Sequence, residues 1–95
     1  MSAYFVARFS VKDAGALGAY SKAAAPIFAS FGGELLFKCN AADALAGEPP
    51  LPGIAVFQFP DRSTLNDFYN SDAYRALTEA RQAGADMVLS GHFIV

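Results

Sequence analysis

The chain has 95 residues, of which 54% are hydrophobic and only 17% charged, so it is too apolar to be intrinsically disordered. This length predicts a single domain over residues 1–95. The formal net charge is −2 and the seven basic side chains are scattered, which argues against a nucleic-acid-binding protein. No apolar run approaches the roughly 20 residues that cross a bilayer. The N-terminus lacks the basic start of a signal peptide, and Cys39 has no partner for an intramolecular disulfide, so we expect a soluble cytoplasmic protein.

The first forty residues predict a strand, a helix and a second strand. Residues 3–11 alternate between two sets of side chains, which is typical of a strand. Asp13 can cap a helix whose apolar residues recur at helical spacing up to residue 31, and Gly32 with Gly33 can end it. Pro26 lies inside that helix and is expected to bend or break it. The second strand is expected over residues 34–40.

The second predicted strand carries apolar side chains at every other position. Strict alternation places Leu35, Phe37 and Cys39 on one face, with Cys39 as a small buried side chain. The same alternation places Lys38 on the opposite face, together with Arg8 of the first strand. We expect these two cations to face a partner chain, where they could form ion pairs or hold an anion near the dimer axis.

A loop and a third strand are predicted next. Gly47 and three prolines over residues 41–52 prevent both strand pairing and helix formation. Residues 53–59 are apolar at nearly every position, which is typical of a strand buried on both faces at the centre of a sheet.

Two helices and a last strand complete the chain. Asp61 or Ser63 can cap a short helix that runs to residue 69, and Ser71 can cap a second helix over residues 72–83. Gly84 is expected to close this second helix, and residues 86–95 to form the fourth strand.

The predicted order β-α-β-β-α-β is that of the α+β, ferredoxin-like class, a four-stranded antiparallel sheet with both helices on one face. The first and third strands are the most apolar and should be the central pair. Their second faces then present a contiguous apolar patch of Tyr4, Val6, Ile54 and Val56. The sheet of a second copy would cover this patch, so the sequence predicts a homodimer through the open sheet face.

Several segments, in chain order, resemble one known family: Asp13 with Tyr20, residues 31–34, residues 57–61, residues 68–74, and Arg81. They resemble the domain of unknown function 1330 family, which belongs to the dimeric α+β barrel superfamily. The resemblance implies a dimer whose two sheets form a barrel-like core, and it implies no particular reaction. The chain departs from the family over residues 47–53, where members often carry Trp and Arg and this sequence has neither.

Three side chains on the apolar stripes of the helices are candidate ligand-binding residues. Arg81 shares a stripe with Tyr74, and its planar guanidinium suits a carboxylate ligand, although an internal acidic partner or the capping of backbone carbonyls is an alternative. Tyr20 and Tyr74 can orient a ligand, and Tyr20 can also donate a proton, or both rings can simply pack in the core. Arg8 is a fourth candidate for ligand binding.

His92 is the single histidine and the candidate general base, with a surface or interface position as the alternative. The sequence has no second histidine and no cysteine pair at ligand spacing, so no metal and no cofactor is expected. Two functions remain open. One is a protein that binds a small apolar or carboxylate-bearing molecule, with or without cofactor-independent catalysis. The other is a non-catalytic dimerisation or accessory module. A cavity near Arg81 and a tyrosine would favour the first.

Overall fold

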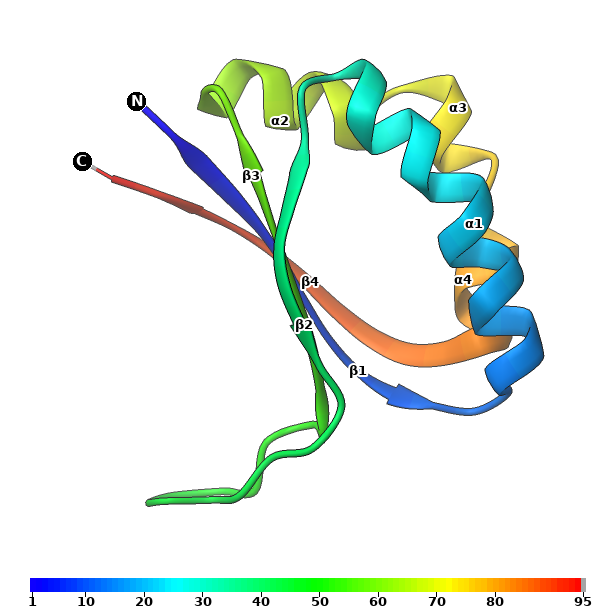
Figure 1. Cartoon of the computed structure of the whole chain (residues 1–95), viewed down its shortest axis with the longest axis vertical. Coiled ribbons are helices and arrows are strands. Elements are labelled where there is room, and N and C mark those ends of the chain that lie inside the picture. Colours follow the sequence, from blue (N-terminus) through cyan, green and yellow to red (C-terminus); the bar gives the residue numbers. More distant parts are fainter. Residues whose placement is uncertain (95) are drawn as a thin grey trace.

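The computed structural model describes residues 1–94 and follows the predicted order of elements (Figure 1). The elements are β1 (Ala3–Val11), α1 (Ala14–Ser30), β2 (Glu34–Cys39), β3 (Gly53–Phe59), α2 (Arg62–Tyr69), α3 (Asp72–Arg75), α4 (Thr78–Gly84) and β4 (Ala85–Phe93).

The four strands form one antiparallel sheet in the order β2-β3-β1-β4, so β1 and β3 are the central pair, as predicted. All the helices cover one face of this sheet, and the other face carries no element (Figure 1). The ferredoxin-like prediction is therefore confirmed, with a sheet that is open and not closed on itself.

The strand register separates the side chains of the two faces. Phe5 lies opposite Phe57 on the helix side, and the core is built there from β1, β3, α1 and α2. Val6 lies opposite Val56 on the other side. We call this second side the open face; its side chains are Tyr4, Val6, Arg8, Ser10, Glu34, Phe37, Cys39, Ile54, Val56, Gln58, Asp86, Val88, Ser90 and His92.

Helix α1 begins and ends where the sequence indicated. The Asp13 carboxylate accepts a hydrogen bond from the Ala16 amide at 2.9 Å, which satisfies a free N–H of the first turn. At the other end the Gly33 amide donates to the Phe28 carbonyl at 2.8 Å, and Gly32 has φ +80°, a conformation that favours glycine. Pro26 neither ends nor divides the helix. Its side chain is exposed, so water can solvate the carbonyl that it leaves unpaired.

The helix predicted over residues 72–83 is instead two short helices, α3 and α4. The chain tightens between them, because the Leu77 amide donates to the Tyr74 carbonyl three residues back rather than four. Helix α4 resumes from the Leu77 carbonyl, which accepts from the Arg81 amide. The turn keeps Tyr74 buried against the core while α4 packs along α1.

Strand β2 departs from the predicted alternation. Leu35 lies opposite Phe57, but the register then shifts, so that Phe37 lies opposite Val56 and Lys38 opposite Ala55. The extra residue is a β-bulge, and it exchanges the two faces of the strand from that point onward. The prediction that Lys38 faces a partner with Arg8 is therefore wrong; Lys38 lies on the helix side. Cys39 lies on the open face and is exposed in the single chain, not buried.

The remaining differences are at segment ends. Strand β4 runs from Ala85 to Phe93, and Val95, included in the predicted strand, lies outside the described residues. The loop over residues 40–52 extends away from the body of the molecule rather than over the helices (Figure 1). Within residues 1–94, no helix combines the length and apolar character needed to cross a membrane.

Candidate functional site

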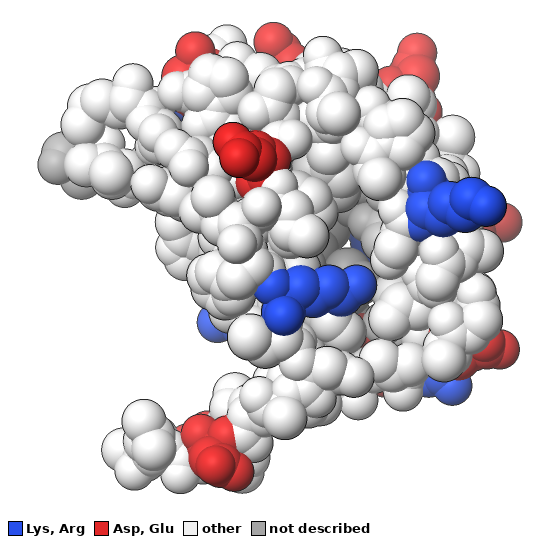
Figure 2. All heavy atoms as spheres, in the orientation of Figure 1, with Lys and Arg blue, Asp and Glu red and all other residues white. Residues whose placement is uncertain are grey.

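A cavity of about 290 Å³ lies between α1 and the helix side of the sheet. Small side chains create the space: Ala7 and Ala55 are cross-strand partners on the sheet, and Ala24 faces them from α1. Larger apolar side chains surround them and make the wall, namely Phe5, Phe9, Leu17, Phe28, Leu35, Phe57 and Met87. Figure 2 shows a hollow between the two layers, with basic side chains on either side of it.

The aromatic part of the wall is tightly packed. Phe28 and Phe57 stack with ring centroids 3.8 Å apart and nearly parallel planes, and Phe5 meets Phe28 edge to face at 5.3 Å. Such packing fixes the ring positions and gives the pocket flat, rigid walls. A planar apolar molecule would therefore find complementary surfaces without rearranging the core.

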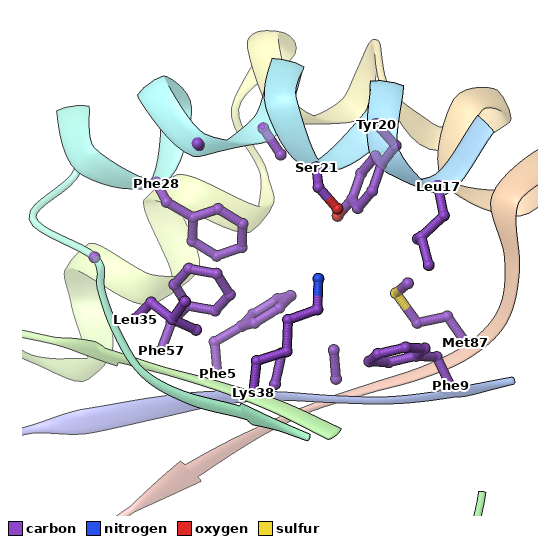
Figure 3. A pocket seen from close by; sticks show the side chains of 15 residues that line it. Phe5, Phe9, Leu17, Tyr20, Ser21, Phe28, Leu35, Lys38, Phe57 and Met87 are labelled. Atoms are coloured by element: carbon purple, nitrogen blue, oxygen red, sulfur yellow. The ribbon is translucent and has the colours of Figure 1, made fainter. Parts of the chain in front are cut away.

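Three polar side chains line this pocket: Tyr20 and Ser21 from α1, and Lys38 from β2. Lys38 rises from the sheet with its ammonium nitrogen directed toward Ser21 and Tyr20 (Figure 3). No carboxylate is among the lining residues. All three groups can donate hydrogen bonds, so the pocket matches a ligand that carries an acceptor group.

Tyr20 is the first member of a hydrogen-bonded chain that runs away from the pocket. Its hydroxyl oxygen lies 2.6 Å from that of Tyr74, and Arg81 Nη1 donates to the Tyr74 oxygen at 3.3 Å. The guanidinium of Arg81 also lies over the Tyr74 ring, 5.7 Å from its centroid.

Either phenol could donate in the hydrogen bond between Tyr20 and Tyr74, and burial favours one of the two orders. If Tyr20 donated to Tyr74, the proton of Tyr74 would need another acceptor inside the core, where Tyr74 is only 1% exposed. If Tyr74 donates, both of its hydrogen bonds are satisfied, and the proton of Tyr20 is free to point into the pocket. The arrangement Arg81 to Tyr74 to Tyr20 therefore leaves one phenol donor for a ligand.

Burial raises the pKa of the Tyr20 phenol above its ordinary value, and the neighbouring Tyr74 raises it further, so Tyr20 stays protonated. Burial alone would lower the pKa of Arg81, but its hydrogen bond to Tyr74 and the neighbouring phenols raise it overall. Tyr20 is thus neutral and Arg81 cationic at ordinary pH, so Tyr20 acts as a donor and is a poor base.

The structure brings together only part of the set singled out in the sequence. Tyr20 lines the pocket, whereas Tyr74 and Arg81 lie behind it and contact it through Tyr20. Arg8 and His92 lie on the open face, across the sheet from the pocket. His92 Nε2 is 2.8 Å from the Ser90 hydroxyl, and its strand partner is Tyr4.

Sequence reasoning missed Lys38 as a pocket residue. The missing information was the bulge, which shifts the alternation of β2 by one residue. The available signal was the pair Leu35-Leu36, two apolar residues in succession where strict alternation expects one.

A second hollow, of about 380 Å³, lies between α2 and β4 and is more open to solvent. Arg62 lies over the Phe93 ring there, 4.4 Å from its centroid, and so covers part of the apolar surface that a ligand would use. Among residues 1–94, no group of three or more His, Cys, Asp or Glu side chains is arranged to hold a metal ion.

Residues 2–91 match the sequence model of a family described as a domain of unknown function, DUF1330. No curated protein is significantly similar to the chain in sequence.

Solved structures share the fold at low sequence identity. The RPA0582 protein of unknown function from Rhodopseudomonas palustris is 18% identical, with a TM-score of 0.79 over 99% of this chain and 82% of that one. SnoaB from Streptomyces nogalater, a cofactor-independent oxygenase, is 14% identical, with a TM-score of 0.69 over 99% and 93% of the two chains. A dimeric ferredoxin-like protein of unknown function from Thermobifida fusca is 17% identical, with a TM-score of 0.61 over 99% and 92%.

Proposed function

The chain belongs to the DUF1330 family, and from that premise we propose that it is a homodimer which binds a small apolar or carboxylate-bearing molecule between α1 and the sheet. The observation that carries the proposal is the cavity of about 290 Å³, walled by aromatic side chains and provided with a few convergent donors. Its size lies near the lower end of small-molecule sites, and its lining has their usual composition.

The polar groups have distinct roles in this proposal. Tyr20 donates its free proton to an acceptor oxygen of the ligand. Tyr74 and Arg81 are positioning residues, because they hold the Tyr20 hydroxyl in one orientation without touching the ligand. Arg8 and His92, on the open face, belong to the dimer contact and not to the pocket.

Binding is better supported than catalysis. The cofactor-independent oxygenase SnoaB is 14% identical to this chain, which is a likeness of fold and assigns no oxygenation. A cofactor-independent enzyme of that kind needs a group that removes a proton from its substrate. The Tyr20 phenol in this pocket has a raised pKa and His92 is on the other face, so neither meets that need in a single chain.

A purely structural module is the alternative. Such a module would have no reason to keep three facing alanines and an apolar void, because an unfilled cavity destabilises a small domain. The cavity therefore favours the binding function.

The neutral aromatic probe 2-naphthamide tests the proposal by titration calorimetry. The wild-type protein should bind it, because the apolar walls do not require a charged ligand. Ser21→Leu places a larger side chain in the pocket and should abolish binding. Ser30→Leu makes the same change on α1 outside the pocket and should leave binding unchanged.

Native mass spectrometry of the freshly purified protein gives an independent measure. We expect twice 10.0 kDa plus a bound species that the Ser21→Leu variant lacks. Equal binding of 2-naphthamide by wild type and Ser21→Leu, or failure of the wild type to bind both 2-naphthamide and its carboxylate analogue 2-naphthoate, would contradict the pocket. A mass of 10.0 kDa would contradict the dimer.

A further inference from the structure

We propose that Lys38 is the anion anchor of the pocket, and that the preferred ligand is a planar aromatic monocarboxylate. The proposal rests on the binding function above and deepens it by naming the anchoring side chain and the ligand class. The sequence suggested Arg81 as the residue that binds an acid group, but Arg81 does not line the pocket. Lys38 does line it and takes that role in this proposal.

The bulge in β2 places Lys38 in the pocket. Without the extra residue, the alternation that starts at Leu35 would put Lys38 on the open face. With it, Lys38 lies opposite Ala55, whose methyl group leaves room for the lysine stem above the sheet. Bulges commonly redirect a side chain toward a binding site, at a cost in regular pairing.

The charge of Lys38 has no partner within the protein. No Asp or Glu among the described residues lies within ion-pair distance of its Nζ, whereas Lys12 pairs with Asp86 at 3.7 Å. The Lys38 Nζ lies over the face of the Phe9 ring, 5.9 Å from its centroid. Lys38 is exposed at the edge of the apolar cavity, and an ammonium there with no internal counter-charge attracts an anion whose body is apolar.

The other donors define the head group. The side chains of Tyr20 and Ser21 face Lys38 from α1 across the pocket (Figure 3). A carboxylate has two oxygens that only accept, so it can bind the ammonium and one of these hydroxyls together. One cation favours a single negative charge over a dianion such as phosphate.

The walls define the body of the ligand. Phe28 stacks on Phe57. Phe5 and Phe9 add further flat surfaces around the two sheet alanines, Ala7 and Ala55. An aromatic ring fills a narrow space between such surfaces and gains offset or edge contacts with them. A branched aliphatic acid of equal size lacks these contacts.

The test compares 2-naphthoate with 2-naphthamide, which has the same ring system and a neutral head group. Wild-type protein should bind the acid about tenfold more tightly than the amide, as expected for a hydrogen bond to a charged group. Lys38→Met should remove this preference by weakening the acid and leaving the amide unchanged. Lys38→Arg should keep it, and Lys22→Met, which removes an exposed lysine outside the pocket, should have no effect.

The outcomes separate the two proposals. Binding of the amide with no preference for the acid, or a preference that survives in Lys38→Met, overturns the anchor and leaves the pocket in place. Loss of the preference in Arg81→Ala but not in Lys38→Met assigns the charge to Arg81 and also overturns it. Failure of both probes to bind wild-type protein overturns the pocket together with its anchor.

Discussion

The phenols of Tyr20 and Tyr74 form a short hydrogen bond inside the core of the described chain. Their oxygens are 2.6 Å apart, and Tyr74 receives a second hydrogen bond from Arg81. A buried polar group that loses its partner costs more free energy than the hydrogen bond itself contributes. The two hydroxyls should therefore depend on each other for stability.

Removal of the two hydroxyls one at a time and together tests this dependence. Tyr20→Phe leaves the Tyr74 proton without an acceptor, and Tyr74→Phe leaves Arg81 without its acceptor and the Tyr20 oxygen without its donor, so each single change should lower the free energy of unfolding by about 1–2 kcal/mol. The double variant should lose less than the sum, with a coupling of about 1 kcal/mol in urea denaturation. Tyr69→Phe, at an exposed tyrosine, is the control and should be neutral. Additive losses would show that the two hydroxyls do not interact.

The raised pKa of Tyr20 predicts a loss of stability in alkali. Above the ordinary tyrosine pKa of 10.0, the unfolded chain releases the Tyr20 proton while the folded chain retains it. The folded state then binds more protons, so the free energy of unfolding falls as pH rises, by at most about 1.4 kcal/mol per pH unit for this group. Denaturation at about pH 9 and about pH 11 should show a steeper fall in wild type than in Tyr20→Phe. Equal slopes would mean that Tyr20 titrates normally.

The contact between helices α1 and α4 shapes the pocket. Leu17 of α1 lines the pocket and also packs against Gly84 of α4. A Cβ atom added at Gly84 would lie 2.6 Å from the Leu17 Cα, which is backbone and cannot move aside. A Cβ added at Gly18 meets nothing within 4 Å. A methyl group therefore fits at Gly18 and does not fit at Gly84.

Gly84→Ala should force the two helices apart and lower the free energy of unfolding by about 1–3 kcal/mol, as overpacking does. Gly18→Ala should instead raise it by about 0.5–1 kcal/mol, because alanine favours the helix. Thermal unfolding of both variants beside wild type measures the difference. Equal effects of the two substitutions would contradict the close packing of α4 on α1.

The sequence predicted the elements where local signals and burial agree. The alternation of β1, the apolar run of β3 and the Gly32-Gly33 stop of α1 all lie as expected. It did not predict the bulge in β2 or the turn that divides α3 from α4. Both are set by tertiary packing: no glycine or proline marks Leu77, and the shift after Leu35 depends on pairing with β3.

The same reason explains the partial success with site residues. Helical spacing was enough to bring Tyr74 and Arg81 together, because residues seven apart lie on one stripe of a helix-like segment. The contact of Tyr20 with Tyr74 joins two segments distant in the chain. The position of the Lys38 side chain in the pocket depends on the one extra residue of the β-bulge. Neither can be inferred from the period of a single element.

The open face presents apolar side chains that the single chain leaves uncovered. Phe37 and Val88 on it are 49% and 50% exposed, and the central strands add Tyr4, Val6 and Ile54 between them. An apolar surface of this kind is typical of an interface between protein chains. A second copy is a self-complementary cover, since a twofold axis brings the same patch to itself.

Val88→Glu tests this interface without endangering the fold. Val88 lies opposite Arg8 in the sheet, so the new carboxylate can pair with that guanidinium in a monomer. In a dimer the same charge would be buried against an apolar partner, at a cost of several kcal/mol. We expect light scattering after size-exclusion chromatography to give twice 10.0 kDa for wild type and a dimer dissociation constant more than about 100-fold higher for the variant.

Ala19→Glu, at an exposed position on α1, is the control and should remain dimeric. A dimer that tolerates Val88→Glu and is broken by Ala19→Glu would place the interface on the helices, and the pocket mouth beside α1 would then open toward the partner chain.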